Sequence, residues 1–498
     1  MKPPIAANLP QEIELKLALP TTDPSSLEKR LQSAPLLARR KLVRRQLHNV
    51  YYDTPDQALR QMRVALRIRR IGSDLNAQWR QTLKMGGRSD SALSQRGEWE
   101  VAVPGNDLSR EMLEGTPWPH IDPEGAIFGA LKPIFVTTFE RVSWEVRRPG
   151  GVVIEVALDI GQVVAGDKTT PICELELELV AGLPAALFDV AQQIARTLAV
   201  LPAAMSKAER GYALAHDTLH LPVRAQPVVL AADLPLDDAP ARVLREMFSQ
   251  FTANLIALRS SDDPELVHQA RVGWRRFKSA CRLFKPVLVP DVMPAWQPLR
   301  PLLIFLGELR DLDVARADTL VSLAEDYVAA DDGRAKKWHA MEQSFDQAAK
   351  LQRKSVHYAL ESPQVGVTLL ELTGWVESLS AGSVQGAGKK SRSLRNWARR
   401  RLQRLHDRFE RLQKEIDSPE AEHRVRILAK RLRYATEVLR LQLPKRHARH
   451  WHEQAVGLQL SLGASRDLNK AGELLGKLDV APDLVAFLRG FAVGQGRR

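Results

Sequence analysis

The sequence predicts an α+β multidomain protein, in which an eight-stranded antiparallel β barrel precedes an all-α domain made of a duplicated helical bundle. Charged and apolar residues alternate along most of the strands expected within residues 10–215. From about residue 240 the apolar period becomes three to four residues, and the helical half then repeats its own motifs. A chain of 498 residues is long enough for two or three separate cores. We expect domains at 1–218 and 241–498, with a proline-rich linker at 219–240 and helical repeats at about 241–380 and 390–498.

Alternating residues punctuated by Gly and Pro predict the strands of the first domain. They are expected at 11–19, 47–53, 63–71, 76–84, 96–103, 137–147, 151–160 and 172–180. Three helices are expected at 27–41, 126–132 and 185–198. Eight antiparallel strands suit a small closed barrel, whose interior can hold side chains or one ligand.

The first strand carries Glu12, Glu14 and Lys16 on one face, because side chains alternate along a strand. Burying unpaired charge is too costly for an ordinary core, whereas a wet barrel interior tolerates it. On one strand such a pattern is more typical of a solvent-facing sheet, where cross-strand charge pairs contribute little energy. Six or more strands share it here, which weakens that alternative. The apolar faces must then pack outward, and the helices at 27–41 and 185–198, with the second domain, are expected to cover them.

The inward positions gather both signs of charge. They are Glu12, Glu14, Lys16, Arg63, Arg67, Arg69, Lys84, Arg96, Glu98, Glu100, Arg141, Glu155, Asp159, Glu174, Glu176 and Glu178. Clustered carboxylates repel one another unless a cation is bound, and their hard oxygen atoms favour Mg²⁺ or Mn²⁺. Arg and Lys fit phosphate oxygens. A metal-bound phosphate chain meets both demands, and this predicts phosphoanhydride hydrolysis with one ion near Glu12 and Glu14 and a second nearer Glu174 to Glu178.

An ordered series of motifs across 10–215 resembles the CYTH superfamily, the triphosphate tunnel metalloenzymes. It comprises Glu12-x-Glu14-x-Lys16, Leu66-Arg67-Ile68-Arg69, Thr82-Leu83-Lys84, Arg96-x-Glu98-x-Glu100, Phe139-Glu140-Arg141, Glu155-x-x-x-Asp159-x-Gly161, Glu174-x-Glu176-x-Glu178 and Ser206-Lys207-x-x-x-Gly211-Tyr212. The resemblance implies an eight-stranded tunnel, a divalent metal and a triphosphate-bearing substrate. A family-like segment at Tyr51-Tyr52-Asp53-Thr54 fits a turn as well as it fits a substrate contact.

The resemblance also implies roles for individual residues. The metal-binding and water-activating candidates are Glu12, Glu14, Glu98, Glu100, Asp159, Glu174, Glu176 and Glu178, of which Glu12, Glu14, Glu174 and Glu176 are the catalytic candidates. The phosphate-binding candidates are Lys16, Arg67, Arg69, Lys84, Arg141 and Lys207. Which glutamates of the last strand contact the metal stays open, since three alternate there.

The net charge of +13 is unevenly distributed. Residues 1–220 carry 27 basic and 26 acidic side chains, whereas residues 221–498 carry 45 basic and 33 acidic ones, which suggests a polyanionic partner for the second half. Cys173 and Cys281 are far apart in sequence and favour a reducing compartment. There is no apolar run of membrane-spanning length and no signal-like start, so we expect a cytoplasmic protein without a membrane partner.

The second half contains an internal repeat. Glu265-x-x-His268-x-x-Arg271-x-x-x-Arg275-Arg276-Phe277-Lys278 returns as Glu420-x-x-His423-x-x-Arg426-x-x-x-Lys430-Arg431-Leu432-Arg433, and the Leu-Gly-x-x-Arg-Asp motif at 306–311 returns at 462–467. Order and spacing are kept, which predicts two helical bundles related by a pseudo-twofold axis. The Gly/Ser-rich stretch at 380–393 is expected to be the loop between them.

Helical spacing places the basic residues of each copy on one face. A solvated basic face is the plainer alternative, and for His268 and His423 a packing role is plainer than metal ligation, because no further metal-ligating residues cluster around them. The paired motifs resemble the CHAD domain over about 240–480, which implies polyphosphate binding on a basic surface. The residues concerned are His268, Arg271, Arg275, Arg276, Arg282, His423, Arg426, Lys430, Arg431 and Arg433.

Three functions are consistent with these patterns. The favoured one is a metal-dependent inorganic triphosphatase with a polyphosphate-binding module, because a charged tunnel offers little apolar surface to a base. The tunnel could instead act on nucleoside or thiamine triphosphate. A third alternative is a non-catalytic protein that binds polyphosphate granules or nucleic acid. Nucleic acid is the less favoured partner, since few aromatic residues interleave with the basic ones.

Overall fold

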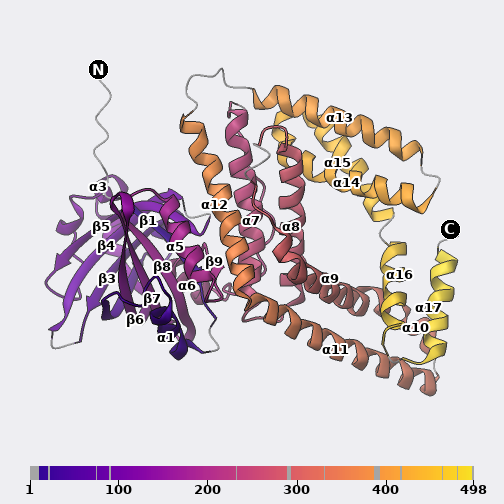
Figure 1. Cartoon of the computed structure of the whole chain (residues 1–498), viewed down its shortest axis with the longest axis horizontal. Coiled ribbons are helices and arrows are strands. Elements are labelled where there is room, and N and C mark those ends of the chain that lie inside the picture. The colour runs from indigo at the N-terminus through magenta and orange to yellow at the C-terminus, as the bar shows by residue number, and fades with distance from the viewer. Residues whose placement is uncertain are drawn as a thin grey trace. The chain divides into compact units, whose positions relative to one another are not determined.

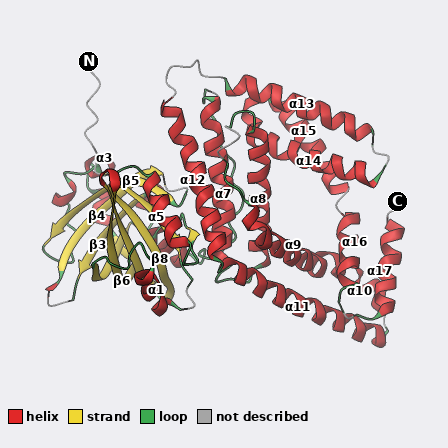
Figure 2. Cartoon of the chain, in the orientation of Figure 1, coloured by secondary structure: helices red, strands yellow, loops and turns green. Residues whose placement is uncertain are grey.

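The computed structural model of the chain describes residues 11–20, 23–73, 76–88, 91–231, 233–288, 293–329, 331–385, 393–415, 418–461, 464–478 and 480–495. The chain divides into two compact units. The first comprises Met1–Leu221 and Glu361–Gly374, and the second comprises Pro222–Leu360 and Trp375–Arg498. All long strands belong to the first unit, and the second is helical (Figure 2). No helix within the described ranges is long and apolar enough to cross a membrane.

Eight strands of the first unit close into an antiparallel barrel (Figure 1). They are β1 (Gln11–Ala18), β2 (Leu42–Asp53), β3 (Val64–Ile71), β4 (Gln78–Arg88), β5 (Leu93–Val103), β6 (Lys132–Arg148), β7 (Val152–Ala165) and β8 (Lys168–Ala181). Their order is β5-β4-β3-β2-β6-β7-β8-β1, and pairing of β5 with β1 closes the ring. A short β9 (Leu201–Pro202) pairs with β1. The predicted barrel and the predicted α+β class are therefore confirmed.

Helices and turns accompany the barrel. They are α1 (Pro24–Ser33), α2 (Ala58–Gln61), α3 (Trp118–Ile121), α4 (Ala126–Ala130), α5 (Ala185–Ala195) and α6 (Lys207–Ala215). The helix predicted over 27–41 was wrong in its second half, because α1 ends at Ser33. Pro35 disfavours helical backbone at the residue before it, and Ala34 is accordingly extended, with ψ of 132°.

The outer face of the barrel is apolar and covered. Leu175 and Leu177 of β8 are fully buried with Leu27 of α1 and Leu187 of α5 in one cluster. A second cluster, around Leu66 of β3, lies beneath α2 and α3. This inverts the usual plan of a barrel, because the helices bury the outward positions and leave the alternate positions of the same strands facing the interior.

The barrel interior is apolar towards one end. Phe135, Phe139 and Val163 pack there against Tyr212 of α6. Gly211 permits this approach, since a Cβ atom at that position would lie 2.3 Å from the Phe135 ring. The rest of the interior is left for charged side chains.

The second unit consists of antiparallel helix pairs and shorter helices. Its elements are α7 (Ala239–Ala257), α8 (Pro264–Phe284), α9 (Arg300–Val314), α10 (Ala324–Val328), α11 (Asp332–Leu360), α12 (Pro363–Gln385, which starts in the first unit), α13 (Leu394–Lys414), α14 (Pro419–Leu439), α15 (Lys445–Ser461), α16 (Ala464–Leu475) and α17 (Pro482–Gln495). Helices α8 and α14 both have 21 residues and start 155 residues apart, as the repeat predicts. The loop predicted at 380–393 was wrong at its start, since α12 continues to Gln385, and residues 386–392 lie outside the described residues.

The segment predicted as a linker is irregular but packed. From Pro222 it belongs to the helical unit. Asn254 of α7 bonds the backbone of Val223 through both its side-chain atoms, and Leu230 is buried. These contacts anchor residues 222–231 onto the helices.

Candidate active site and basic helical surface

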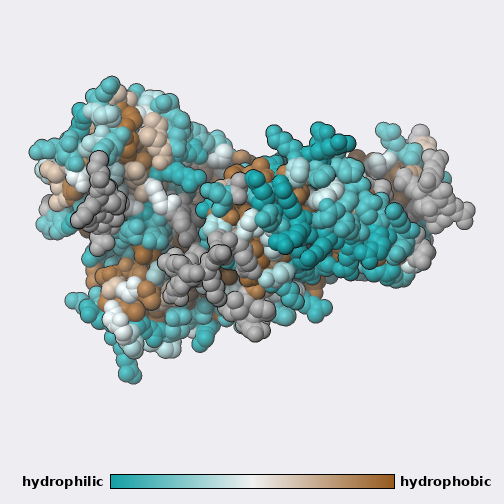
Figure 3. Space-filling model, turned by 90° about the horizontal axis from the view of Figure 1, so that it is seen from above, coloured by the Kyte–Doolittle hydropathy of each residue, from teal (hydrophilic) through white to brown (hydrophobic). Residues whose placement is uncertain are grey.

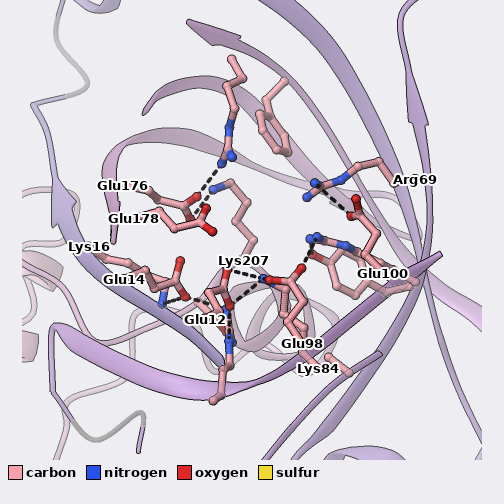
Figure 4. A pocket seen from close by; sticks show the side chains of 18 of the residues that line it. Glu12, Glu14, Lys16, Arg69, Lys84, Glu98, Glu100, Glu176, Glu178 and Lys207 are labelled. Atoms are coloured by element: carbon pink, nitrogen blue, oxygen red, sulfur yellow. Dashed lines mark hydrogen bonds and ion pairs between the residues drawn. The ribbon is translucent and has the colours of Figure 1, made fainter. Parts of the chain in front are cut away.

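A cavity of about 260 Å³ occupies the charged part of the barrel interior (Figure 4). We call it the inner cavity. Its walls carry seven carboxylates and eight cationic side chains: Glu12, Glu14, Glu98, Glu100, Glu155, Glu176 and Glu178, with Lys16, Arg45, Arg67, Arg69, Lys84, Arg96, Arg141 and Lys207. Tyr51, Phe139, Ser206 and two alanines complete the lining. Of the predicted inward residues, all but Arg63, Asp159 and Glu174 line this cavity.

On the β1 side of the cavity, the carboxylate of Glu12 has two cationic partners. It accepts hydrogen bonds from Lys84, at 2.7 Å, and from Nε of Arg96, at 2.9 Å. Burial by itself would raise the pKa of Glu12, but the charges of Lys84 and Arg96 outweigh it and hold the pKa below its ordinary value. The same balance, with Lys84 and Arg67 as the cations, lowers the pKa of Glu98. Both carboxylates are therefore ionised near neutral pH.

A second group of charges surrounds Lys207, the first residue of α6. Ser206 caps this helix, since its hydroxyl accepts from the Glu209 N–H while the Glu209 carboxylate accepts from the Ser206 N–H. The cap fixes the start of α6, and with it the position of Lys207 inside the barrel. Its ammonium lies 2.5–2.8 Å from carboxylate oxygens of Asp159, Glu174 and Glu176.

Asp159 and Glu174 lie beneath the cavity wall and not on it. The carboxylate oxygens of Asp159, Glu174 and Glu176 lie within 4.8 Å of one another, a spacing that could hold a metal ion. The Lys207 ammonium already contacts all three, Arg141 forms two bonds to Asp159, and Arg210 bonds Glu174 at 2.6 Å. This geometry disfavours the predicted metal-binding role of Asp159 and Glu174, because their negative charge is neutralised by fixed side chains.

Glu178 is in the opposite situation. It stands directly across the strands from Glu155 and from Glu14. Burial, followed by the neighbouring charge of Glu12, raises the pKa of Glu178 to about 7. Negative charge here exceeds what the nearby cations neutralise, and hard carboxylate oxygens are the ligands that Mg²⁺ and Mn²⁺ prefer. The charges of Glu12, Glu98 and Glu155 all contribute to this rise in the pKa of Glu178, so a divalent ion near these four carboxylates would relieve their repulsion.

Positive charge is in excess on another wall of the same cavity. Arg69 is bonded to Asn49 at 2.7 Å, and Arg67 donates to the hydroxyl of Tyr51 at 3.2 Å. Burial, then repulsion from Arg67 and Arg141, lowers the pKa of Arg69 to about 10. The neighbouring arginines thus make the charged form of Arg69 less favourable, and a bound anion would reduce the repulsion among them.

Several lining residues were not predicted as site residues. Arg45 was missed because the predicted strand began at residue 47, whereas β2 begins at Leu42. Arg96 and Glu155 were placed inward without being given a role. Tyr51 lines the cavity, where a substrate contact is possible, whereas Asp53 accepts hydrogen bonds from the backbone N–H groups of Thr54, Leu59 and Arg60 and so has the turn role. The two alternatives predicted for this segment thus apply to different residues. Arg63 was predicted to face inward and was misplaced: it precedes β3 and is exposed.

The helical unit places its predicted basic residues in several environments. His268 is half-buried, and its burial, then the charge of Arg310, lowers its pKa. Arg271 packs over Gly307, where a Cβ atom would lie 2.7 Å from its guanidinium. A side chain at position 307 would therefore displace the Arg271 guanidinium from its place on α9. The side chains of the second copy, at 462–467, lie outside the described residues.

Arg276 does not belong to an open surface. It is buried, donates to Gln250 at 2.7 Å and lies 3.5 Å from Glu246. These partners give it a structural role and disfavour the predicted anion contact. Arg275 and Arg431 differ from Arg276, because neither has a carboxylate within ion-pair distance among the described residues. Like Arg276, each has a buried Nε atom without a hydrogen-bond partner.

Arg431 marks a cluster of like charges. Burial, then repulsion from Arg282 of α8 and Arg408 of α13, lowers its pKa. Arg401 of α13 reaches the backbone carbonyl of Arg282. In the view of Figure 3 the surface over α13 is almost continuously hydrophilic. Three helices thus bring cations together with little local compensation.

Comparisons with known proteins agree with this architecture. The CYTH domain model matches residues 10–212, and the CHAD domain model matches residues 242–476. The chain therefore carries a CYTH domain followed by a CHAD domain. An inorganic triphosphatase from Haemophilus influenzae is 34% identical over 205 residues, 41% of this chain and 55% of the relative, so the match spans about half the relative's length.

Two solved structures are also similar. The CHAD domain from the plant Ricinus communis is 28% identical with a TM-score of 0.47, covering 55% of this chain and 91% of that one. A putative adenylyl cyclase from Hippeastrum, described as having a dominant triphosphatase activity, is 22% identical with a TM-score of 0.31. The match covers 41% of this chain and 95% of the cyclase chain.

Proposed function

We propose that the barrel domain hydrolyses inorganic triphosphate with the help of Mg²⁺ or Mn²⁺. One observation carries the proposal: a single cavity is lined by carboxylates and cationic side chains together. In it, burial and then neighbouring carboxylates raise the pKa of Glu178, while burial and then neighbouring arginines lower that of Arg69. A divalent cation and a polyanion bound together would relieve both. The similarity of this domain to an inorganic triphosphatase supports the same chemistry.

The side chains divide the work by charge. Glu12, Glu98, Glu155 and Glu178 would hold the metal, with Glu14 beside them on β1. A bound divalent ion supplies charge neutralisation on the phosphate oxygens and lowers the pKa of a bound water. Arg67, Arg69 and Arg141 bind and orient the phosphates as rigid forks, and Lys16, Lys84 and Lys207 add point charges.

The predicted catalytic role of Glu176 is kept, whereas Glu174 is better placed to position Lys207. Glu176 lines the cavity and contacts both Arg141 and Lys207, so it holds two of the proposed substrate-binding cations in place. Burial alone would raise its pKa, but Lys207 and Arg141 hold the pKa well below its ordinary value. An ionised Glu176 is suited to orient a water molecule by accepting its hydrogen bond.

The lining favours an inorganic substrate. Apart from charged groups, the inner cavity exposes only Tyr51, Phe139, Ser206 and two alanines among its described lining residues. A phosphate chain is recognised by the fixed cations alone, whereas a base or a thiazole ring would need apolar surface that this cavity hardly provides.

Phosphate release tests the proposal. The full chain is incubated with triphosphate, ATP and thiamine triphosphate, each with Mg²⁺, Mn²⁺ or EDTA. We expect metal-dependent release, with triphosphate the best substrate and a loss of more than 100-fold in Glu12→Gln. Glu114→Gln, an exposed matched change, should be unaffected. Absence of release from all three substrates would sink the enzymatic proposal.

For the helical unit we propose polyphosphate binding. The support is the convergence of Arg282, Arg408 and Arg431 and the buried, unbonded Nε atoms of Arg275 and Arg431. Arginine clusters without acids are costly unless an anion compensates them, and a phosphate chain offers many oxygens to guanidinium groups. We expect the affinity to fall steeply with salt.

A further inference from the structure

A second cavity, of about 600 Å³, adjoins the inner one. The two share Ala65, Lys84, Arg96, Ser206 and Ala208 as lining residues. The second cavity lies at the start of β3, at the Gly86-Gly87 end of β4 and against α6. We call it the entrance cavity, because the exposed residues Arg60 and Arg63 line it. The shared residues place the two cavities next to each other.

Two arginines contribute cations that nothing in the proposed chemistry uses. Arg60 and Arg63 line the entrance cavity, and neither has a carboxylate partner among the described residues. Arg60 donates to Gln57 at 2.7 Å and stacks over the Tyr212 ring, 5.0 Å from its centroid. The single carboxylate in the lining, Glu209, is engaged by the cap of α6. The entrance cavity therefore has a net positive wall.

The backbone holds both arginines in place. Gln57 and Arg63 lie on either side of α2 and have left-handed φ angles of 60° and 57°. Such a conformation costs a non-glycine residue about 1 kcal/mol or more, and it persists where surrounding contacts enforce it. Asp53 provides those contacts, because it accepts the backbone N–H groups of Leu59 and Arg60 and the hydroxyl of Tyr212.

We infer that the entrance cavity is a subsite for the part of a linear phosphate chain that extends beyond three phosphates, with Arg60 and Arg63 as its chain-length determinants. The inference rests on the proposed hydrolysis in the inner cavity and extends its substrate class to tetraphosphate and longer chains. In the reaction one water adds to the terminal phosphorus, one P–O anhydride bond breaks, and tetraphosphate yields triphosphate and orthophosphate while the water proton is released to solvent. No further reactant is needed.

Charge selects this occupant over an organic group. The apolar lining, Val64, Met85 and Tyr212, is discontinuous, and Arg60 already covers the Tyr212 ring. A base would find no free aromatic face there among the described residues. Extra phosphates would instead meet two guanidinium groups not neutralised by acids.

The experiment compares kcat/KM for triphosphate, tetraphosphate and ATP with Mg²⁺ in the full chain. The variants are Arg60→Ala, Arg63→Ala, Arg63→Gly and Arg63→Lys. Loss of one charged hydrogen-bond donor should lower kcat/KM for tetraphosphate about tenfold, mainly through KM, and change that for triphosphate less than threefold. Arg63→Lys should restore most of the loss. Arg63→Gly, which accepts the left-handed backbone without strain, should behave as Arg63→Ala does.

Arg147→Ala is the matched control, since Arg147 is exposed, pairs with Glu145 and lines neither cavity. Equal losses for triphosphate and tetraphosphate, or none, would overturn the subsite. A loss confined to ATP would show an organic-group site instead. If the wild-type chain cleaves triphosphate in any of these cases, the proposed function survives. If it cleaves nothing, calorimetric binding of tetraphosphate against triphosphate decides the subsite: a selective loss in Arg63→Ala supports it, and an equal affinity refutes it.

Discussion

Glu178 links the proposed metal site to the stability of the barrel. Its pKa of about 7 in the folded chain exceeds the ordinary value of 4.5, so between these pH values the folded protein binds more protons than the unfolded chain. The free energy of unfolding therefore falls as pH rises through this window, and the penalty is complete above pH 7.

We predict that Glu178→Gln raises the melting temperature of the metal-free protein at pH 8 by about 2–4 °C, with the gain vanishing towards pH 4.5. Added Mg²⁺ should stabilise the wild type more than the variant, because binding to the folded state shifts its equilibrium. Calorimetric melting in EDTA and in Mg²⁺ measures both effects. Parallel pH profiles for the two proteins would contradict the charge excess at Glu178.

Asp159 tests the layer beneath the cavity. It is fully buried and bonds Arg141 and Lys207, so Asp159→Asn should leave two buried cations poorly compensated and lower the free energy of unfolding by about 3 kcal/mol. Metal affinity should change less than threefold, in contrast to Glu12→Gln. Urea denaturation measures the change in unfolding free energy, and metal titration measures the change in affinity. As a control, Glu145→Gln removes the exposed ion-pair partner of Arg147 and should lower the free energy of unfolding by at most about 1 kcal/mol. A large loss of metal affinity would restore Asp159 as a ligand.

Strand alternation predicted which side chains face the barrel interior, but it could not predict their depth. Strand alternation places Glu174, Glu176 and Glu178 on the same face of β8, yet their surroundings differ. Glu174 pairs with Lys207 and Arg210 beneath the cavity, Glu176 contacts Lys207 from the cavity wall, and Glu178 lies near other carboxylates. The difference is set by which residue lies opposite on β7 and by Lys207, which arrives from a helix about 30 residues further along the chain. Such long-range partners leave no mark on the local sequence.

At the scale of elements, the charged interior depends on helices that cover the outside. Leu187 of α5 is fully buried against the apolar face of the barrel, so we predict that Leu187→Ala lowers the free energy of unfolding by about 2–5 kcal/mol. Leu183→Ala, three-quarters exposed just before the same helix, should cost less than about 0.5 kcal/mol. Chemical denaturation compares them. Similar costs would show that α5 does not cover the barrel as described.

The existence of the strands was predictable because each carries its own alternation, whereas their ends were not. The β2 and β6 strands start five residues earlier than expected. The additional residues of each strand pair with the expected part of the other, and Val136 also pairs with β7. Arg44 and Arg45 lie in this extension, where two adjacent arginines mask the period. One boundary did have a local signal, since Pro35 explains the early end of α1.

At the scale of the whole molecule, each of the two domains carries one of the two proposed anion sites. The duplication was predictable from motif spacing, and the 155-residue offset recurs between the starts of α7 and α13 as well as α8 and α14. The environments of the repeated residues were not predictable, because they depend on packing. Arg276 is buried and paired, while its counterpart Arg431 lies among arginines. The two halves therefore contribute unequally to the proposed polyphosphate surface.

Two sites in one chain should be separable by substitution. We predict that Arg275→Ala with Arg431→Ala weakens polyphosphate binding at least tenfold and flattens its salt dependence, because fewer phosphates are neutralised. Triphosphate hydrolysis should stay within twofold of wild type. Glu12→Gln should do the reverse, abolishing hydrolysis and leaving polyphosphate affinity unchanged. Fluorescence anisotropy with labelled polyphosphate at several salt concentrations, alongside phosphate release, measures both.

A charge-matched control separates a specific surface from net charge. Arg316→Ala with Lys337→Ala also removes two cations, but these already pair with Asp346 and Asp483, so polyphosphate affinity should fall less than twofold. If this control weakens binding as much as the Arg275 and Arg431 pair does, the helical unit attracts polyanions through its overall charge. If Glu12→Gln weakens polyphosphate binding instead, the polymer is held in the barrel, because only there does that carboxylate organise the cations.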